Sequence, residues 1–110
     1  MKDVVFDPNA RKAIKGFPKD AKMEFGKLLV VLQEGKVLGM PNSRPMPSVA
    51  KGASELRIKD RSGNFRIFYY TKVKDELLIF HAFMKKTSNT PIREIEVAKK
   101  RLAKMLNSEQ

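Results

Sequence analysis

The chain has 110 residues, which is enough for one domain with a buried core and too few for two. Hydrophobic residues make up 42% and charged residues 32% of the sequence, which argues against wholesale disorder. Lysine and arginine total 23 against 12 acidic residues, so the formal net charge is +11. This charge favours a polyanion as partner, because each phosphate contact releases condensed counterions. A generally cationic surface and an acidic protein partner remain alternatives that charge alone does not separate.

Two further bulk properties limit the class of protein. The absence of cysteine excludes disulfides and thiolate metal sites and fits a cytoplasmic location. The longest apolar stretches, residues 28–32 and 77–84, are far shorter than the ~20 residues that span a bilayer. We therefore expect a protein without a membrane partner.

The first half of the chain predicts one strand and two helices. Residues 4–6 are apolar and precede the turn residues Asp-Pro-Asn, which indicates a short strand. Residues 7–17 then predict a short helix that is stopped by Gly16. Pro18 suits the first turn of a second helix, and Gly35 suits its C-terminal cap. The apolar stripe of this second helix has the i, i+3, i+4, i+7 spacing and consists of Phe25, Leu28, Leu29 and Leu32.

The second half predicts three strands and a closing helix. Residues 35–53 hold three of the six prolines and three of the six glycines, and they predict a loop that crosses to a sheet. Residues 54–60, 64–72 and 76–84 are rich in Ile, Phe and Tyr and predict strands. Short polar connections join them, so these strands must be antiparallel neighbours. Residues 91–106 predict a helix whose lysines and arginine lie mostly outside its apolar stripe.

The element order β-α-α-β-β-β-α predicts an α+β fold, with an antiparallel sheet and helices packed on one face. No internal repeat and no domain boundary interrupts the sequence. Residues 1–110 are therefore expected to form a single domain.

Alternation along the first strand of the hairpin set separates its charged residues from its apolar ones. Glu55, Arg57 and Lys59 share one side of this strand, and Leu56 and Ile58 share the other. The helices should cover the apolar side. The two cations and the carboxylate therefore line the open face of the sheet.

The next strand adds an arginine between aromatic residues on one side. Arg66 shares that side with Phe68 and Tyr70. A charged group in a central strand needs a partner or water. Pairing of Arg66 with a carboxylate such as Glu55 is one interpretation of this position.

Two lysines, Lys85 and Lys86, stand where the third strand leaves the sheet. If the open face is concave, they complete a cationic pocket with Arg57, Lys59 and Arg66. Phe68 and Tyr70 would form its aromatic floor. Such a pocket suits single-stranded nucleic acid, because bases stack on aromatic side chains and cations hold the phosphates. The alternative is a solvated strand end whose lysines discourage edge pairing.

His81 is the only histidine, and it can act as a general acid or base near neutral pH. Inside an apolar run, however, a hydrogen-bonded core position is the favoured interpretation. One histidine without cysteine does not supply the convergent ligands of a metal site. The sequence has no phosphate-binding loop, dinucleotide fingerprint, nucleophile elbow or zinc-finger spacing. We expect no metal and no cofactor.

Several segments together resemble the phage-derived HigB-like branch of the RelE/ParE toxin superfamily. They are ELRI (55–58), FRIFYY (65–70), LLIFHAFMKKTSNTP (77–91) and IREIEVAKKRL (92–102). That branch tends to show a WELR-type strand, a Tyr-Arg strand with aromatics, and a strand ending F-x-KKT-x-x-TP before an I-x-x-A helix. Ser54 stands where an aromatic residue is common. The match covers roughly residues 18–106, is strongest over 54–102, and is most specific in FMKKTSNTP.

The resemblance implies a compact α+β toxin that is held inactive by an antitoxin with a helix-turn-helix domain. Operator DNA would be contacted only through that antitoxin. It further implies an endoribonuclease that enters the ribosomal A site and cleaves mRNA without a metal. In this reaction the ribose 2′-hydroxyl attacks the adjacent phosphate, which requires a base, cations for the phosphorane charge, and an acid.

The positions that match the functional residues of the family are Arg57, Lys59, Arg66 and Lys86, with Lys85 beside it. The resemblance implies Lys59 or Glu55 as the base. It implies Arg57 and Arg66 as phosphate ligands and Lys86 as the cation near the leaving oxygen. His81 is a further candidate for proton transfer.

Two other functions stay open at this stage. One is a ParE-like toxin that binds a topoisomerase through its helices, since fold alone does not decide function. The other is a non-catalytic module that binds nucleic acid or an antitoxin. A topoisomerase poison would not require the cations of the open face, so these residues discriminate between the alternatives.

Overall fold

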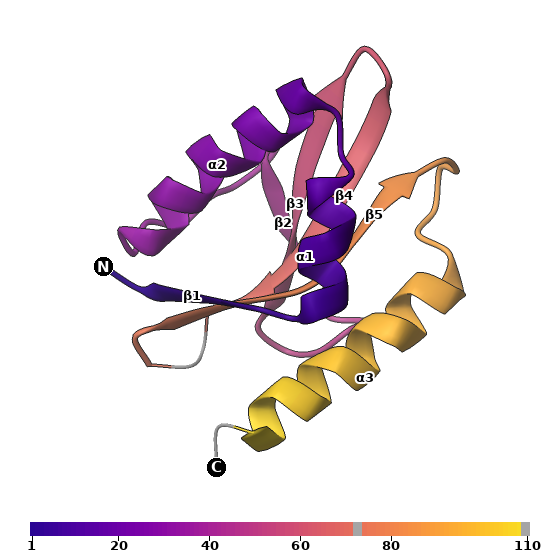
Figure 1. Cartoon of the computed structure of the whole chain (residues 1–110). Helices are drawn as coiled ribbons and strands as arrows, with labels where there is room; N and C mark the ends of the chain where they lie inside the picture. Colours follow the sequence, from indigo (N-terminus) through magenta and orange to yellow (C-terminus); the bar gives the residue numbers. More distant parts are fainter. Residues whose placement is uncertain (72–73, 109–110) are drawn as a thin grey trace.

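The computed structural model describes residues 1–71 and 74–108; the part of the predicted second hairpin at residues 72–73 lies outside this range. The elements in chain order (Figure 1) are β1 (Asp3–Phe6), α1 (Pro8–Lys15), α2 (Lys19–Gln33), β2 (Ser43–Pro45), β3 (Ala53–Asp60), β4 (Gly63–Tyr70), β5 (Glu76–Lys85) and α3 (Ile92–Ser108). The predicted α+β order is confirmed. The short strand β2 is an addition, inside the segment predicted as a loop.

The strands of the described residues form one sheet in the order β1-β5-β4-β3-β2. The three predicted hairpin strands are antiparallel neighbours, as expected. β1 instead pairs with β5 in parallel, and the chain between these two strands comprises both helices and the three other strands. β2 pairs with the first part of β3 and leaves the rest of that edge to a loop, where Arg57 N–H donates to Asn42 O at 2.8 Å.

Helices α1 and α2 pack on one face of the sheet, as predicted. The Asp7 carboxylate caps α1 by accepting from Ala10 N–H at 2.9 Å, and Pro8 occupies the first turn. α2 ends before Gly35, which has a φ of 85° that suits glycine. The buried residues of α2 are Ala21, Phe25, Leu28 and Leu32, which pack with the inward side chains of β3, β4 and β5.

Helix α3 lies on the opposite face, so the predicted packing of helices on one face applies to α1 and α2. Its buried residues Ala98 and Leu102 pack with Phe68, Leu78 and Phe80 of the sheet. The apolar loop residues Met46 and Val49 join this second core. Figure 1 shows α3 crossing the side of the sheet away from α1 and α2. Both faces of β5 are therefore buried. No helix within the described ranges is long and apolar enough to cross a membrane.

A β-bulge interrupts the pairing of β4 with β5. Phe68 pairs with His81, whereas the next residue, Tyr69, pairs with Ile79. Phe80 is thus the extra residue on β5. Phe80 packs in the core beneath α3, and the neighbouring His81 bonds to α3 as well.

Candidate nucleic-acid interface

Cross-strand pairing gathers cations on the face of the sheet that carries α3. Arg57 on β3 lies directly opposite Arg66 on β4, which lies opposite Phe83 on β5. The next row outward, on the same side of the pleat, consists of Lys59, Asn64 and Lys85. Opposed residues on neighbouring strands project to the same face, with Cβ atoms about 4.5–5.5 Å apart. The register thus brings side chains from three strands into one patch.

A buried carboxylate organises this patch. Glu55 is fully buried, and its Oε1 lies 3.1 Å from Arg44 Nε, 3.4 Å from Arg66 Nε and 3.9 Å from Arg57 Nε. We call these four residues the Glu55 cluster. One negative charge lies within ion-pair distance of three guanidinium groups, so the cluster keeps a positive surplus for an incoming anion.

A groove of about 620 Å³ opens beside the cluster, between the β3–β4 hairpin, the start of α2 and the loop before β2. Its lining comprises Asp20, Glu24, Met40, Pro41, Asn42, Arg57, Ile58, Lys59, Asp60, Arg61, Asn64 and Arg66. Three of the four predicted catalytic residues, Arg57, Lys59 and Arg66, therefore line one groove. The two carboxylates of α2 form its opposite wall.

The hairpin that carries these cations is held by its own turn. Asp60 Oδ1 accepts from Ser62 N–H at 2.8 Å and from Gly63 N–H at 3.2 Å. Gly63 has a φ of 153°, and a Cβ added there would collide with Met84 Cε. The positive φ favours glycine at this position, whereas the flexible end of the Met84 side chain can move aside. The turn fixes where Arg61 and Asn64 enter the groove.

The cations are crowded and partly desolvated. Burial lowers the pKa of Arg66, an effect that Glu55 opposes and that Arg57 and Arg44 reinforce. Burial also lowers the pKa of Lys85, and the nearby Arg66 lowers it further. An anion placed among these groups would be stabilised by each of them.

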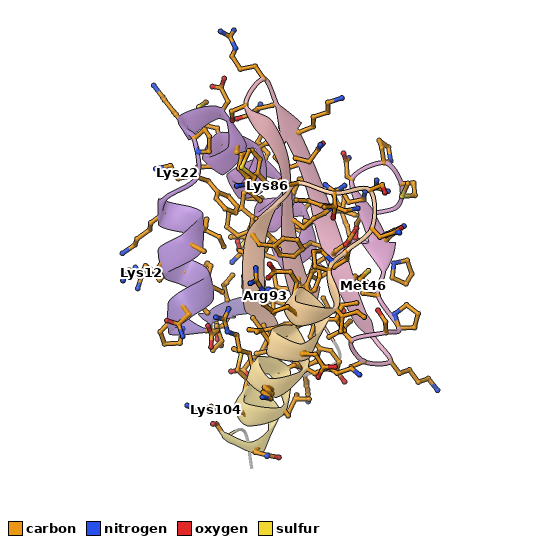
Figure 2. All side chains as sticks on the ribbon, turned by 90° about the vertical axis from the view of Figure 1, so that its right-hand side faces the viewer. Lys12, Lys22, Met46, Lys86, Arg93 and Lys104 are labelled. Atoms are coloured by element: carbon orange, nitrogen blue, oxygen red, sulfur yellow. The ribbon has the colours of Figure 1, made fainter. Side chains whose placement is uncertain are left out.

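The two lysines at the end of β5 occupy different environments. Lys85 is the last residue of the strand and faces the Glu55 cluster. Lys86 follows the strand and is exposed; Figure 2 labels it where the chain leaves β5. The geometry therefore favours Lys85 over the predicted Lys86 as the lysine that shares a site with Arg66.

Three residues predicted to bind substrate are buried or partly buried. Phe68 has no exposed surface, because α3 and the Met46 loop cover it, so it is not an aromatic floor for a base. Tyr70 is partly buried against the same core. Glu55 is enclosed by arginines, which suits a positioning role rather than that of a base.

His81 belongs to a second polar group, under α3. It is 4% exposed; its Nε2 lies 2.7 Å from Glu94 Oε1, and its Nδ1 lies 2.9 Å from Arg101 Nη1. A guanidinium only donates, so Nδ1 is the acceptor and Nε2 carries the proton that goes to Glu94. Arg101 Nε also lies 3.7 Å from Asp7 Oδ2. These four residues, the His81 cluster, tie α3 to β5 and to the cap of α1, so His81 is a hydrogen-bonded core residue.

Two residues of the patch were missed from the sequence. Arg44 lies in the segment predicted as a loop, and only its pairing on β2 reveals that it faces Glu55. Phe83 is half-buried beside Arg66, and its ring lies 5.3 Å from that of His81. Phe83 is thus an aromatic surface next to the cations. Over residues 1–71 and 74–108, no group of three or more His, Asp or Glu side chains is arranged to hold a metal ion.

The fold defines the class of protein. It is similar to the structure of the isolated E. coli RelE toxin, with 20% sequence identity, 96% of this chain and 99% of that chain covered, and a TM-score of 0.52. It is also similar to a doubly substituted variant of E. coli toxin RelE in the free state, with 21% identity, 93% and 95% coverage, and a TM-score of 0.51. At these identities the likeness establishes a RelE-like fold.

The sequence supplies the family. The chain belongs to the family described as Phage derived protein Gp49-like, whose sequence model matches residues 12–103. The match includes every residue of the Glu55 cluster. A comparison with curated proteins gave no match.

Proposed function

We propose that this protein is the toxin of a toxin–antitoxin pair, of the HigB-like type, and that it cleaves mRNA on the ribosome in the cytoplasm. Membership of a phage-derived family and a RelE-like fold support this proposal. The observation that carries it is the Glu55 cluster, in which three guanidinium groups lie around one carboxylate beside a groove. The sequence resemblance adds a helix-turn-helix antitoxin as the inhibiting partner.

The proposed reaction is a transesterification within the RNA chain. The 2′-oxygen forms a bond to phosphorus as the P–O5′ bond breaks, which leaves a 2′,3′-cyclic phosphate and a 5′-hydroxyl. Arg57 and Arg66 stabilise the extra negative charge of the phosphorane, because donors preorganised where charge develops lower the barrier. Glu55 holds them in place, so no reorganisation is required in the transition state.

Two lysines of the patch, Lys59 and Lys85, are the proposed groups for proton transfer. Lys59 is exposed at the groove and is the proposed base for the 2′-hydroxyl. Lys85 is the proposed acid for the 5′-oxygen, because its lowered pKa makes the ammonium group a better proton donor. Phe83 offers a face for a base next to the scissile phosphate.

The test is cleavage of a defined mRNA on programmed ribosomes. Arg57→Ala should reduce the cleavage rate by about 10²–10³-fold, the usual cost of one transition-state donor. Lys59→Ala should also abolish most activity. Lys27→Ala is the matched control, since it removes one exposed cation of α2 outside the groove. Wild-type rates for both Arg57→Ala and Lys59→Ala would overturn the assignment.

Induced expression distinguishes the other functions. Translation arrest with cut transcripts supports the proposal. DNA damage with an SOS response would identify a topoisomerase poison, and absence of toxicity would identify a binding module. Both of these results contradict mRNA cleavage.

A further inference from the structure

The outer edge of β1 is open. β1 is an end strand of the sheet, and Asp3 N–H and Asp7 N–H donate toward β5, to Asp75 O at 2.9 Å and to Ile79 O at 2.8 Å. Backbone groups alternate in direction along a strand, so the N–H and C=O groups of Val4 and Phe6 point away from the sheet. Within the described residues, neither of these N–H groups has a backbone acceptor outside the strand pairing.

The start of the same edge is already occupied. Lys2 N–H donates to Gln33 O at 2.9 Å, and Gln33 Nε2 donates to Lys2 O at 3.1 Å. Gln33, at the end of α2, therefore pairs with the outward N–H and C=O groups of Lys2, and this pairing does not extend to Val4. The free edge begins at Val4 and ends at Phe6, which offers two donors and two acceptors to a further strand.

A groove lies on each side of this free edge. The groove toward α1 has a volume of about 560 Å³ and is lined by Val4, Val5, Phe6, Pro8, Arg11, Lys12 and Lys15. The groove toward α3 has a volume of about 280 Å³ and is lined by Val5, Phe6, Asp7, Pro8, Lys104, Met105 and Ser108. Figure 1 shows β1 ending at the start of α1, with α3 below it. An added strand would place alternate side chains in the two grooves.

The chemistry of the grooves selects the occupant. Their floors are apolar, and Val4, Val5 and Phe6 are each only half-buried. Their rims are cationic, and Figure 2 shows Lys12 on α1 and Lys104 on α3 projecting to the same side of the molecule. The one carboxylate among these lining residues, Asp7, is engaged by Ala10 N–H and Arg101.

We propose that the free edge of β1 is a docking site for an extended protein segment that alternates apolar and acidic residues and adds as a strand. Main-chain hydrogen bonds to Val4 and Phe6 supply affinity, and the rims supply charge complementarity. An RNA strand has no peptide groups for the open edge. A second copy of this chain would bring like charges together, since each copy carries +11.

The docking site is separate from the cationic groove. β5 and β4 lie between β1 and β3, so the strands β1 and β3 are about 14 Å apart at the usual strand spacing. A segment bound at β1 therefore leaves Arg57 and Lys59 accessible. Docking and RNA cleavage should be separable by mutation, and failure of one proposal leaves the other standing.

The experiment uses a fluorescent octapeptide of alternating Glu and Val, measured by anisotropy and by amide chemical shifts of the labelled protein. Binding should shift and protect the Val4 and Phe6 amides. A twin peptide N-methylated on alternate residues, and a Lys-Val twin, should each bind at least about tenfold more weakly. Added salt should weaken the binding of the Glu-Val peptide, because it screens the attraction between the peptide carboxylates and the lysines.

Two variants test the site in the protein. Val4→Pro removes an outward donor while keeping the bonds to β5, as proline is tolerated on edge strands; it should weaken binding about tenfold more than Val4→Ala does. Lys12→Glu should weaken binding while RNA cleavage stays at the wild-type rate. The proposal is overturned by equal binding of the N-methylated twin, by shifts over β3 and β4 instead, by no binding up to about 1 mM, or by concentration-dependent dimerisation through β1. If Val4→Pro fails to fold, the comparison of the two peptides on the wild-type protein still decides.

Discussion

Two polar clusters lie on the same face of the sheet and differ in charge balance. The Glu55 cluster sets one carboxylate against three guanidinium groups and borders an open groove. The His81 cluster sets two carboxylates against one guanidinium and a neutral imidazole, and α3 covers it. The first keeps a surplus charge at the surface, as a site for an anion requires. The second is internally satisfied and holds helices together.

The largest expected effect is on stability, from removing the charge at the centre of the first cluster. Glu55→Gln leaves Arg66, which is 6% exposed, without its counter-charge. Breaking a buried ion pair from one side typically costs about 3–5 kcal/mol, and the solvent-exposed partners Arg44 and Arg57 place this case near the lower limit. Urea unfolding measures the loss. An unchanged midpoint would show that the carboxylate is dispensable.

A smaller effect separates the two lysines at the end of β5. Lys85→Ala should reduce mRNA cleavage by about tenfold or more, because this side chain faces Arg66 and is the proposed acid. Lys86→Ala should change the rate by less than about twofold, as for an exposed charge outside the site. The two variants have the same net charge, so each controls for the other. A larger loss of cleavage rate in Lys86→Ala than in Lys85→Ala would assign the role of the acid to Lys86.

The matching substitution in the His81 cluster, Glu94→Gln, should hardly change the free energy of unfolding. The side-chain amide oxygen in Glu94→Gln still accepts from His81 Nε2–H, so the hydrogen bond survives without the charge. We expect a loss of about 1 kcal/mol or less in the free energy of unfolding. A loss equal to that of Glu55→Gln would mean that both clusters depend on charge.

The smallest effect is a pH dependence of stability from His81. Burial lowers the pKa of His81 below its ordinary value of 6.5, although Glu94 opposes this shift. The unfolded chain therefore binds more protons than the folded chain below about pH 6.5, and the free energy of unfolding falls as pH falls through that range. Urea unfolding from about pH 7.5 to 5.5 should show this slope, and His81→Asn should reduce it. An identical slope in the variant would show that His81 is not its source, and a steeper slope would contradict the sign.

Alternation in the sequence predicted the hairpin strands and their faces well. Leu56, Ile58 and Ile67 point to the core under α2, and Arg57 and Arg66 point to the other side, as expected. Period-2 patterning is local information, and three strands joined by short turns have few other ways to pair. The family match, over residues 12–103, includes all three of these strands.

The missed features depend on contacts between distant segments. The apolar stripe of α3 predicts that this helix is buried but does not predict on which face of the sheet. Because α3 packs on the face opposite α1 and α2, it covers Phe68. The three-residue strand β2 has no period of its own, so Arg44 was not recognised as a partner of Glu55. The parallel pairing of β1 with β5 likewise joins segments about 70 residues apart in the chain.

The bulge at Phe80 decides to which face of the sheet Lys85 points. Before it, the odd-numbered residues Leu77 and Ile79 point toward α2; after it, Ala82 takes that direction and the odd-numbered positions, Lys85 included, point the other way. Deleting a single residue there would invert every later side chain of β5, sending Met84 to the face that carries the Glu55 cluster and Lys85 toward α2. The place of Lys85 beside the Glu55 cluster thus depends on one inserted amino acid earlier in the strand.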